Sequence, residues 1–262
     1  MITSGPLFPI PGNKLRACLA LFFCAFYIFS APANSKFSAQ DIVWMTEEYP
    51  PYNFHNYEGE LVGVSVDLLE AIMKRMHIDF DKNSILVVPW ARAYRHTLNT
   101  PNAAVFTMTK SQHRSGLFQF SEAIMPSNIS IITLRNTLKL NKVADLNPLN
   151  VGVVRNDIGE QLLKKHGLKN ESTVKLPTSL ELIRMLLLNR IDVVAIDEAI
   201  ANFEFNRLGV KPEEYTTHFT IEKLTTHYAF NAAIDKNFIA DFSAAFEQLK
   251  ADGTFEQIRA KY

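Results

Sequence analysis

Three polar residues, Thr107, Thr109 and Arg114, could together grip a small anionic molecule. They follow a short apolar run, residues 103–106, that is typical of a β-strand. Thr109 with Gln112 three residues later fits a capping box, so we expect a helix to begin there. The unpaired N–H groups of a helix N-terminus attract an anion, and an arginine adds a bidentate contact with a carboxylate. On this segment alone, an ordinary capped helix with a solvated arginine is the favoured interpretation.

Aromatic residues follow two other predicted strands. Tyr49 comes after the apolar run 42–46 and precedes two prolines, which support neither a strand ladder nor a helix. Trp90 comes after the run 85–88, where a helix is expected to begin. Aromatic rings at these positions suit the mouth of a ligand cleft. A packed turn explains Tyr49 equally well, and a core position is the favoured interpretation of Trp90.

Carboxylates occupy the matching positions later in the chain. Asp157 follows the apolar run 151–154 and begins a capped helix, and Asp197 ends the run 191–196. Ligands of open α/β sheets bind outside the carboxyl ends of the strands. Arg114 from one unit and Asp197 from the other would therefore make complementary contacts with a zwitterion.

The elements that position these residues alternate between strand and helix twice. The β-α-β-α-β order implies parallel strands with helical crossovers in each unit, separated by the polar segment 136–150. A capped helix is expected to begin at Thr178, a returning strand at residues 228–230, and an amphipathic helix near the C terminus. The predicted strands are residues 42–46, 85–88 and 103–106 in the first unit, and 151–154, 174–176 and 191–196 in the second.

The N-terminal 35 residues have the pattern of a secretory signal. They contain Lys14 and Arg16 but no acidic residue, then an uncharged run, residues 17–29, and small residues around Ala33. This run is too short to favour a membrane span, which needs about 20 apolar residues. We predict a signal peptide over residues 1–35, with an uncleaved anchor as the alternative.

Composition excludes several classes for the mature chain. Both cysteines lie within the predicted signal, so a secreted form would rely on its core rather than on disulfides. Without Lys14 and Arg16 the chain has 25 basic and 27 acidic residues, and no basic run that would favour nucleic acid. The seven histidines show no metal-ligand spacing. The length allows one large domain or two small ones.

Over nearly its full mature length, the chain resembles the bacterial periplasmic solute-binding proteins of the polar amino acid type, family 3. No single motif is decisive, but their order and spacing make the match specific. The matching segments are Tyr49-Pro50-Pro51-Tyr52, residues 59–63 with 67–69, Thr107 and Thr109 with Arg114, residues 189–192 with Asp197, and residues 249–254 with the final Lys261-Tyr262.

This resemblance implies the type II periplasmic binding fold, with two α/β lobes joined by two crossover strands. The crossovers would lie near residues 127–133 and 225–230. Residues 36–129 and 225–262 would form lobe 1, and residues 130–224 would form lobe 2. The family closes on its ligand. We also expect a monomer that needs no cofactor.

The resemblance further implies a role for each matching residue. Arg114 would bind the α-carboxylate of an amino acid, helped by the backbone N–H of Thr109 and of Asp157 or Ile158. The Thr109 hydroxyl and the Asp197 carboxylate would hold the α-amino group. Aromatic rings would flank the ligand side chain. The expected ligand-binding residues are Arg114, Thr109, Asp197, Thr107, Tyr49, Trp90, Asp157 and Ile158.

Three functions compete. The leading one is capture of an amino acid or similar small polar solute for delivery to a membrane ABC transporter permease. The second is ligand sensing for a receptor partner. The third is an enzyme resembling cyclohexadienyl dehydratases, in which Glu48 or Asp157 would be the general acid. Asn102 and Asn189 replace residues usual in the family, which leaves the ligand open. Because no nucleophile-base pair or metal triad is evident, we expect a protein that is not an enzyme.

Overall fold

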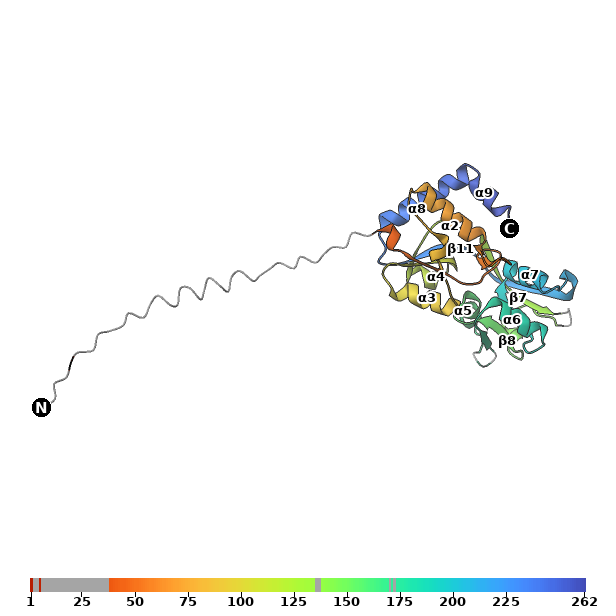
Figure 1. Ribbon diagram of the computed structural model, residues 1–262. Coiled ribbons are helices and arrows are strands. Elements are labelled where there is room, and N and C mark those ends of the chain that lie inside the picture. Colours follow the sequence, from red (N-terminus) through yellow and green to blue (C-terminus); the bar gives the residue numbers. More distant parts are fainter. Residues whose placement is uncertain (2–4, 6–37, 135–137, 170, 172) are drawn as a thin grey trace. The chain divides into compact units, whose positions relative to one another are not determined.

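The computed structural model describes residues 38–134, 138–169, 171 and 173–262, together with Met1 and Gly5 (Figure 1). Apart from those two positions, the predicted signal peptide lies outside the described residues. The helices and strands all belong to the unit Phe37–Tyr262. No helix in the described part of the chain combines the length and apolarity needed to cross a bilayer.

Three parallel strands form the first half of the main sheet. The central strand β1 (Val43–Thr46) pairs with β4 (Leu86–Val87) on one side and with β5 (Ala103–Thr109) on the other. Helix α2 (Val64–Arg75) lies in the connection from β1 to β4, and α3 (Trp90–Asn99) connects β4 to β5. The predicted β-α-β-α-β order is confirmed, and it places the ends of β1 and β5 at one edge of the sheet.

The second half repeats this arrangement with three further parallel strands. Strand β8 pairs with β9 on one side and with β10 on the other. The Thr178 hydroxyl accepts the N–H of Glu181 at 3.2 Å, which caps the second helix as predicted. The elements of this half are β8 (Val151–Val154), α5 (Ile158–Lys165), β9 (Thr173–Leu176), α6 (Ser179–Leu187), β10 (Val193–Asp197) and α7 (Glu198–Arg207).

Within the described residues, two long strands join the halves into one sheet of nine strands. Strand β7 (Pro126–Leu134) pairs antiparallel with β10. Strand β11 (Tyr215–Asn231) pairs with β7 as far as Thr225 and then, from Thr226, with β5. The returning strand is therefore much longer than the short run at residues 228–230 that the sequence indicated. The assignment of whole lobes to the ranges given above stays a prediction.

The core of the first half is built around aromatic rings. Trp44 stacks on Phe242 of helix α8 (Lys236–Ala251) with ring centres 5.9 Å apart, and Tyr228 and Phe230 of β11 pack edge-on against it. The amphipathic C-terminal helix is thus confirmed. The remaining elements are η1 (Ala39–Asp41), β2 (Phe54–His55), β3 (Leu61–Val62), η2 (Lys82–Ser84), α4 (Gln112–Ser115), β6 (Phe118–Phe120), η3 (Val143–Leu146), η5 (Pro212–Glu214) and α9 (Thr254–Arg259).

Candidate ligand-binding site

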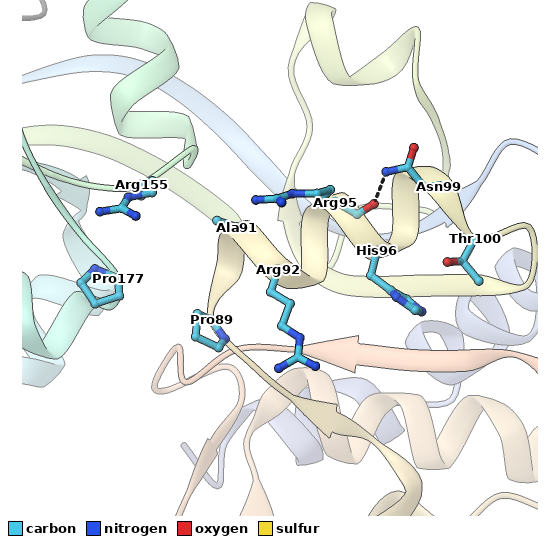
Figure 2. Close-up of a pocket in the computed structure, with 9 residues that line it drawn as sticks. All are labelled: Pro89, Ala91, Arg92, Arg95, His96, Asn99, Thr100, Arg155 and Pro177. Carbon is cyan, nitrogen blue, oxygen red and sulfur yellow. Dashed lines mark hydrogen bonds between the residues drawn. The ribbon is translucent and has the colours of Figure 1, made fainter.

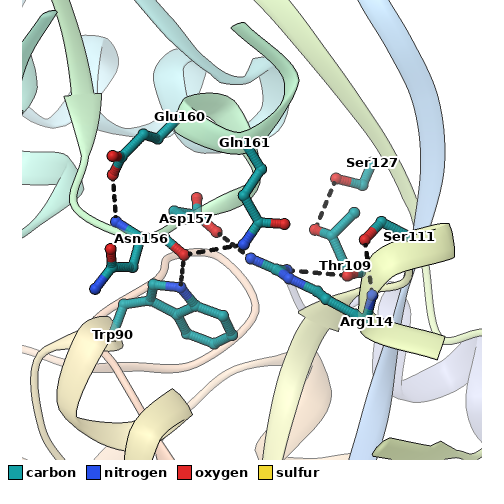
Figure 3. A network of polar contacts seen from close by, with 9 residues as sticks. All are labelled: Trp90, Thr109, Ser111, Arg114, Ser127, Asn156, Asp157, Glu160 and Gln161. Atoms are coloured by element: carbon teal, nitrogen blue, oxygen red, sulfur yellow. Dashed lines mark hydrogen bonds and ion pairs between the residues drawn. The ribbon is translucent and has the colours of Figure 1, made fainter. Parts of the chain in front are cut away.

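Arg114 is fully buried, with an exposed fraction of 0%. Its Nη1 donates to the backbone oxygen of Thr109 at 2.9 Å, and its Nη2 lies 3.4 Å from Oδ1 of Asp157 (Figure 3). The guanidinium lies 5.0 Å from the ring centre of Trp90 and 5.6 Å from that of Tyr94, within the range of cation–π attraction. Among the described residues its Nε has no hydrogen-bond partner, so the side chain retains donor capacity for a ligand.

The helix that carries Arg114 begins later than predicted. Strand β5 continues through Thr109, and the N-cap residue is Ser111, whose hydroxyl accepts the N–H of Arg114 at 3.3 Å. The capping box expected at Thr109 is therefore wrong. Helix α4 has only 4 residues. Because so short a helix sums few peptide dipoles, attraction for an anion rests mainly on the guanidinium.

Thr109 and Thr107 are two residues apart on β5 but have different surroundings. Strand alternation alone would place both side chains on one face. Thr107 has a φ of 61°, and the pairing of β5 with β11 shifts register nearby, which marks a bulge. The Thr107 hydroxyl bonds to Asn53 and lies 2.9 Å from the hydroxyl of Ser65, whereas the Thr109 hydroxyl lies 3.4 Å from that of Ser127. Thr107 therefore supports the buried turn at Asn53.

Asp157 and Ile158 begin helix α5, as predicted. Asp157 is the N-cap residue, but its side chain makes no capping hydrogen bond and lies beside Arg114 instead. Burial raises the pKa of Asp157, while the neighbouring Arg114 guanidinium and the backbone N–H of Ile158 oppose that rise. A carboxylate of the second half thus lies against the guanidinium of the first.

Asp197 ends strand β10 and caps helix α7. Its Oδ1 accepts the N–H groups of Ala199 at 2.9 Å and Ile200 at 3.3 Å. Within the described residues its buried Oδ2 has no partner of normal hydrogen-bond geometry. Burial raises the pKa of Asp197 to about 6, although the Ser127 hydroxyl and these two N–H groups act in the opposite direction. One carboxylate oxygen is thus fixed by the helix, and the other, near the Ser127 hydroxyl, can still accept a ligand proton.

A third buried carboxyl, that of Glu47, was missed from the sequence. It follows β1 directly and is 6% exposed. Burial raises the pKa of Glu47 well above its usual value, nearby Asp157 adds to the rise, and Arg114 opposes it. By contrast Glu48, named above as a possible general acid, has a side chain that is 44% exposed and bonded to His55. The signal that could have found Glu47 was its position directly after a strand.

Two tyrosines lie among the carboxyl groups. Burial raises the pKa of Tyr49 well above its usual value, and the charges of Asp157, Asp197 and Glu47 add to the rise. Burial also raises the pKa of Tyr52, and the charge of Asp197 adds to the rise. Tyr49 therefore lies near the buried carboxyl groups, as does Tyr52, which was noted only as part of the Tyr-Pro-Pro-Tyr motif. A contact of Tyr49 with a ligand stays a prediction.

Trp90 connects the two halves directly. Its indole N–H donates to the backbone oxygen of Asn156 at 3.0 Å, and its ring contacts the Arg114 guanidinium (Figure 3). Asn156 is held in turn, because its N–H donates to Oε2 of Glu160 at 2.6 Å. Trp90 thus packs in the core, but it also lines the polar site. Its contact with Asn156 could not be foreseen, since it depends on how the halves meet.

The comparisons with known proteins agree with this architecture. Residues 42–262 match the model of the bacterial extracellular solute-binding proteins, family 3. The chain is 26% identical over 236 residues to the arginine-binding periplasmic protein of Mannheimia haemolytica, covering 86% of this chain and 91% of the relative. It is 23% identical over 229 residues to the histidine-binding periplasmic protein of Salmonella typhimurium, covering 82% and 84%.

Solved structures show the same fold at low identity. A substrate-binding protein of an ABC uptake transporter from Streptococcus pneumoniae, solved with bound histidine, superposes with a TM-score of 0.76 at 19% identity, covering 87% of this chain and 94% of that one. A histidine kinase sensor domain with similarity to periplasmic binding proteins gives a TM-score of 0.74 at 21% identity, covering 84% and 95%. The fold is that of the periplasmic amino acid-binding proteins, and the chain belongs to the bacterial extracellular solute-binding proteins, family 3.

Proposed function

We propose that this protein captures an α-amino acid with a cationic side chain in the periplasm and delivers it to a membrane ABC transporter. The observation that carries the proposal is the fully buried Arg114 guanidinium, which lies beside two aromatic rings and keeps an unpaired donor among the described residues. The paired N–H donors of a guanidinium suit the two oxygens of an α-carboxylate. Two relatives are named as arginine-binding and histidine-binding proteins, which supports the same ligand class.

Charge favours a cationic ligand. The site holds one guanidinium, that of Arg114, and three carboxyl groups, those of Glu47, Asp157 and Asp197, and burial raises the pKa of each carboxyl. Crowded carboxylates in a site of low dielectric are stabilised by a bound cation. Asp197 would accept the α-ammonium, and Glu47 with Asp157 would face the side-chain cation. Tyr49 and Trp90 would flank the aliphatic part of the ligand.

Two contacts between the halves indicate how the site would close. The Trp90 indole bonds to Asn156, and Arg114 lies against Asp157. A ligand held by Arg114 from one half and Asp197 from the other would stabilise this closed form over an open one. The two strands β7 and β11, which join the halves, would then act as the hinge.

A thermal-shift screen tests the ligand class. The mature protein is heated with arginine, lysine, ornithine and histidine, and with glutamate and leucine as controls. A ligand at 100 times its Kd should stabilise the folded state by about 2.7 kcal/mol. The proposal expects the largest shifts from the dibasic amino acids. Stabilisation by glutamate alone, or by a solute that lacks a carboxylate, would contradict it.

Periplasmic location is tested separately by mass. We expect the exported protein to lack residues 1–35, since the N-terminal pattern is that of a secretory signal. Intact-mass measurement on a periplasmic fraction should give the mass of the shortened chain. Recovery of the full-length mass from that fraction, or a lipid attached to Cys24, would rule out the predicted cleavage.

A further inference from the structure

A basic pocket is lined by residues of both halves of the sheet (Figure 2). It has a volume of about 510 Å³, and its lining residues include no Asp or Glu. Arg92, Arg95 and His96 of helix α3 line one side, and Arg155 and Pro177 of the second half line the other. The pocket is distinct from the ligand site, because it contains none of the residues proposed above to touch the solute.

The arginines of this pocket have no acidic partner. Arg92, Arg95 and Arg155 are exposed, and none forms an ion pair with any Asp or Glu in the described ranges. The chain as a whole has equal numbers of basic and acidic residues, so a pocket lined by three arginines and no acid is a local departure from its average. Gathering like charges in a concave surface focuses a positive potential, which attracts an anionic partner.

The same two chain segments form both the pocket and the ligand site. In the first segment, Trp90 contacts Arg114 and Arg92 lines the pocket. In the second segment, Asp157 lies against Arg114 and Arg155 lines the pocket. Between them, the hydrogen bond from Trp90 to Asn156 holds the segments together. A change in the ligand site that separates these segments would also separate the arginines of the pocket.

We infer that this pocket is a docking site for an acidic segment of a protein partner that recognises the closed form. The inference rests on the proposed function, since closure on a solute is what would assemble the pocket. Guanidinium groups match carboxylates with two parallel hydrogen bonds, a geometry that favours Asp and Glu side chains over a diffuse charge. The concave shape also suits an inserted segment better than a flat membrane surface. Contact with arginines from both halves would let the partner distinguish closed protein from open protein.

Fluorescence polarisation of a labelled acidic peptide tests the docking site. A short fluorescein-labelled peptide of alternating glutamate and glycine is titrated with the mature protein, at low and at physiological salt. The double variant Arg92→Gln/Arg155→Gln should bind the peptide about tenfold more weakly, because each exposed charge pair contributes up to about 1 kcal/mol. Each single variant should lose part of that affinity, since the pocket takes one arginine from each half.

A matched variant separates the pocket from overall charge. Arg184→Gln/Arg190→Gln removes two other exposed arginines of the second half, and it should bind the peptide within about twofold of the wild type. An equal loss of peptide affinity in both double variants would overturn the docking site and indicate general charge attraction. Tighter binding of citrate than of the peptide, or capture by anionic vesicles in place of the peptide, would overturn it in favour of a small anion or a membrane.

The same variants keep this test independent of the solute. Arg92→Gln/Arg155→Gln leaves the residues of the ligand site in place, so the thermal shift given by arginine should equal that of the wild type. Loss of peptide binding with an unchanged shift supports the docking site. If no amino acid shifts the wild type but the peptide still distinguishes the two pairs, the ligand proposal fails while the pocket stands.

Discussion

Oδ1 of Asp157 lies 3.4 Å from Nη2 of Arg114, so the guanidinium proposed to hold a ligand carboxylate already faces a carboxylate of the protein. The two residues come from opposite halves of the sheet. A solute that binds Arg114 must therefore share or displace this contact. Because the side chain of Asp157 is only 15% exposed, it would then be stabilised by a cation of the same ligand.

Replacement of Arg114 should abolish tight binding. Arg114→Ala removes one partner of a buried charge pair, a loss of about 2–5 kcal/mol, which corresponds to roughly 30-fold to several thousand-fold in Kd. Arg114→Lys should also bind more weakly, because a point charge cannot reproduce the two parallel hydrogen bonds of the fork. Calorimetric titration with the solute found by thermal shift measures both. Circular dichroism checks the fold, and Arg190→Ala is the control. Near-native affinity in Arg114→Ala would show that no ligand carboxylate binds there.

Glu47→Gln should change selectivity. Loss of a contact with a charged group costs about 1.5–3 kcal/mol, so the Kd for a dibasic amino acid should rise roughly tenfold or more. An amino acid with an uncharged side chain should be much less affected. Glu48→Gln, at the neighbouring exposed residue, should change affinity by less than about 0.5 kcal/mol. An equal loss for charged and uncharged ligands would mean that Glu47 does not face the side-chain cation.

The same variant should raise stability in the absence of ligand. The folded-state pKa of Glu47 is raised above its ordinary value of 4.5, so this carboxyl lowers the stability of the fold as pH rises from that value through the folded-state pKa. Glutamine removes this cost, and thermal unfolding at neutral pH should therefore occur at a higher temperature. Higher stability with weaker binding is typical of residues kept for function. A lower Tm would instead indicate that Glu47 holds the structure together.

Ligand affinity should depend on pH through Asp197. Its folded-state pKa is raised to about 6 from an ordinary value of 3.8. A bound ammonium favours the carboxylate, so binding should release a proton near pH 5, and affinity should rise with pH up to about 6 and then level off. Between pH 4 and 6 the change should approach about tenfold per pH unit. Stability without ligand should show the opposite sign, because folding raises this pKa. Asp197→Asn should remove the part of the pH dependence of ligand affinity that is due to this carboxyl. Calorimetric titration in buffers of several pH values measures this dependence.

Gly159→Ala should loosen the support of the site. A Cβ at Gly159 would lie 2.5 Å from the backbone oxygen of Ala195, so helix α5 would have to move from strand β10, which carries Asp197. Overpacking of this kind costs about 1–3 kcal/mol. Gly116→Ala is the control, since its nearest atom would lie 3.7 Å away. Equal denaturant midpoints for the two variants would contradict the close contact between α5 and β10.

The fold was largely predictable because local sequence patterns indicate the order of its strands and helices. Apolar runs identified the strands, and Thr178 marked the start of α6 through a cap that uses only neighbouring residues. Strand β11 was underestimated because its first part, residues 215–225, is polar and half-buried, so no apolar run marks it. Its pairing with β7 comes from tertiary contacts that periodicity does not encode.

The candidate site was predictable where residues end strands, and less so elsewhere. Thr109 ends β5 and Arg114 follows it, and Asp157 and Asp197 lie at the carboxyl ends of β8 and β10. The two halves place these ends opposite each other where β7 and β11 pass from one half to the other. Thr107 was placed with them by alternation, but the bulge there turns its hydroxyl toward Asn53. The binding roles themselves stay predictions.

Strand β11 also has a consequence for how the chain comes to be folded. It completes both halves of the sheet, yet it begins at Tyr215, and Thr226 pairs with Thr109 far back in the sequence. During synthesis, neither half can be finished until nearly the whole chain has left the ribosome. Pairing over such sequence separations is slow. Because folding is late and slow, the new chain stays unfolded for longer. This suits a protein that we propose crosses a membrane before it folds.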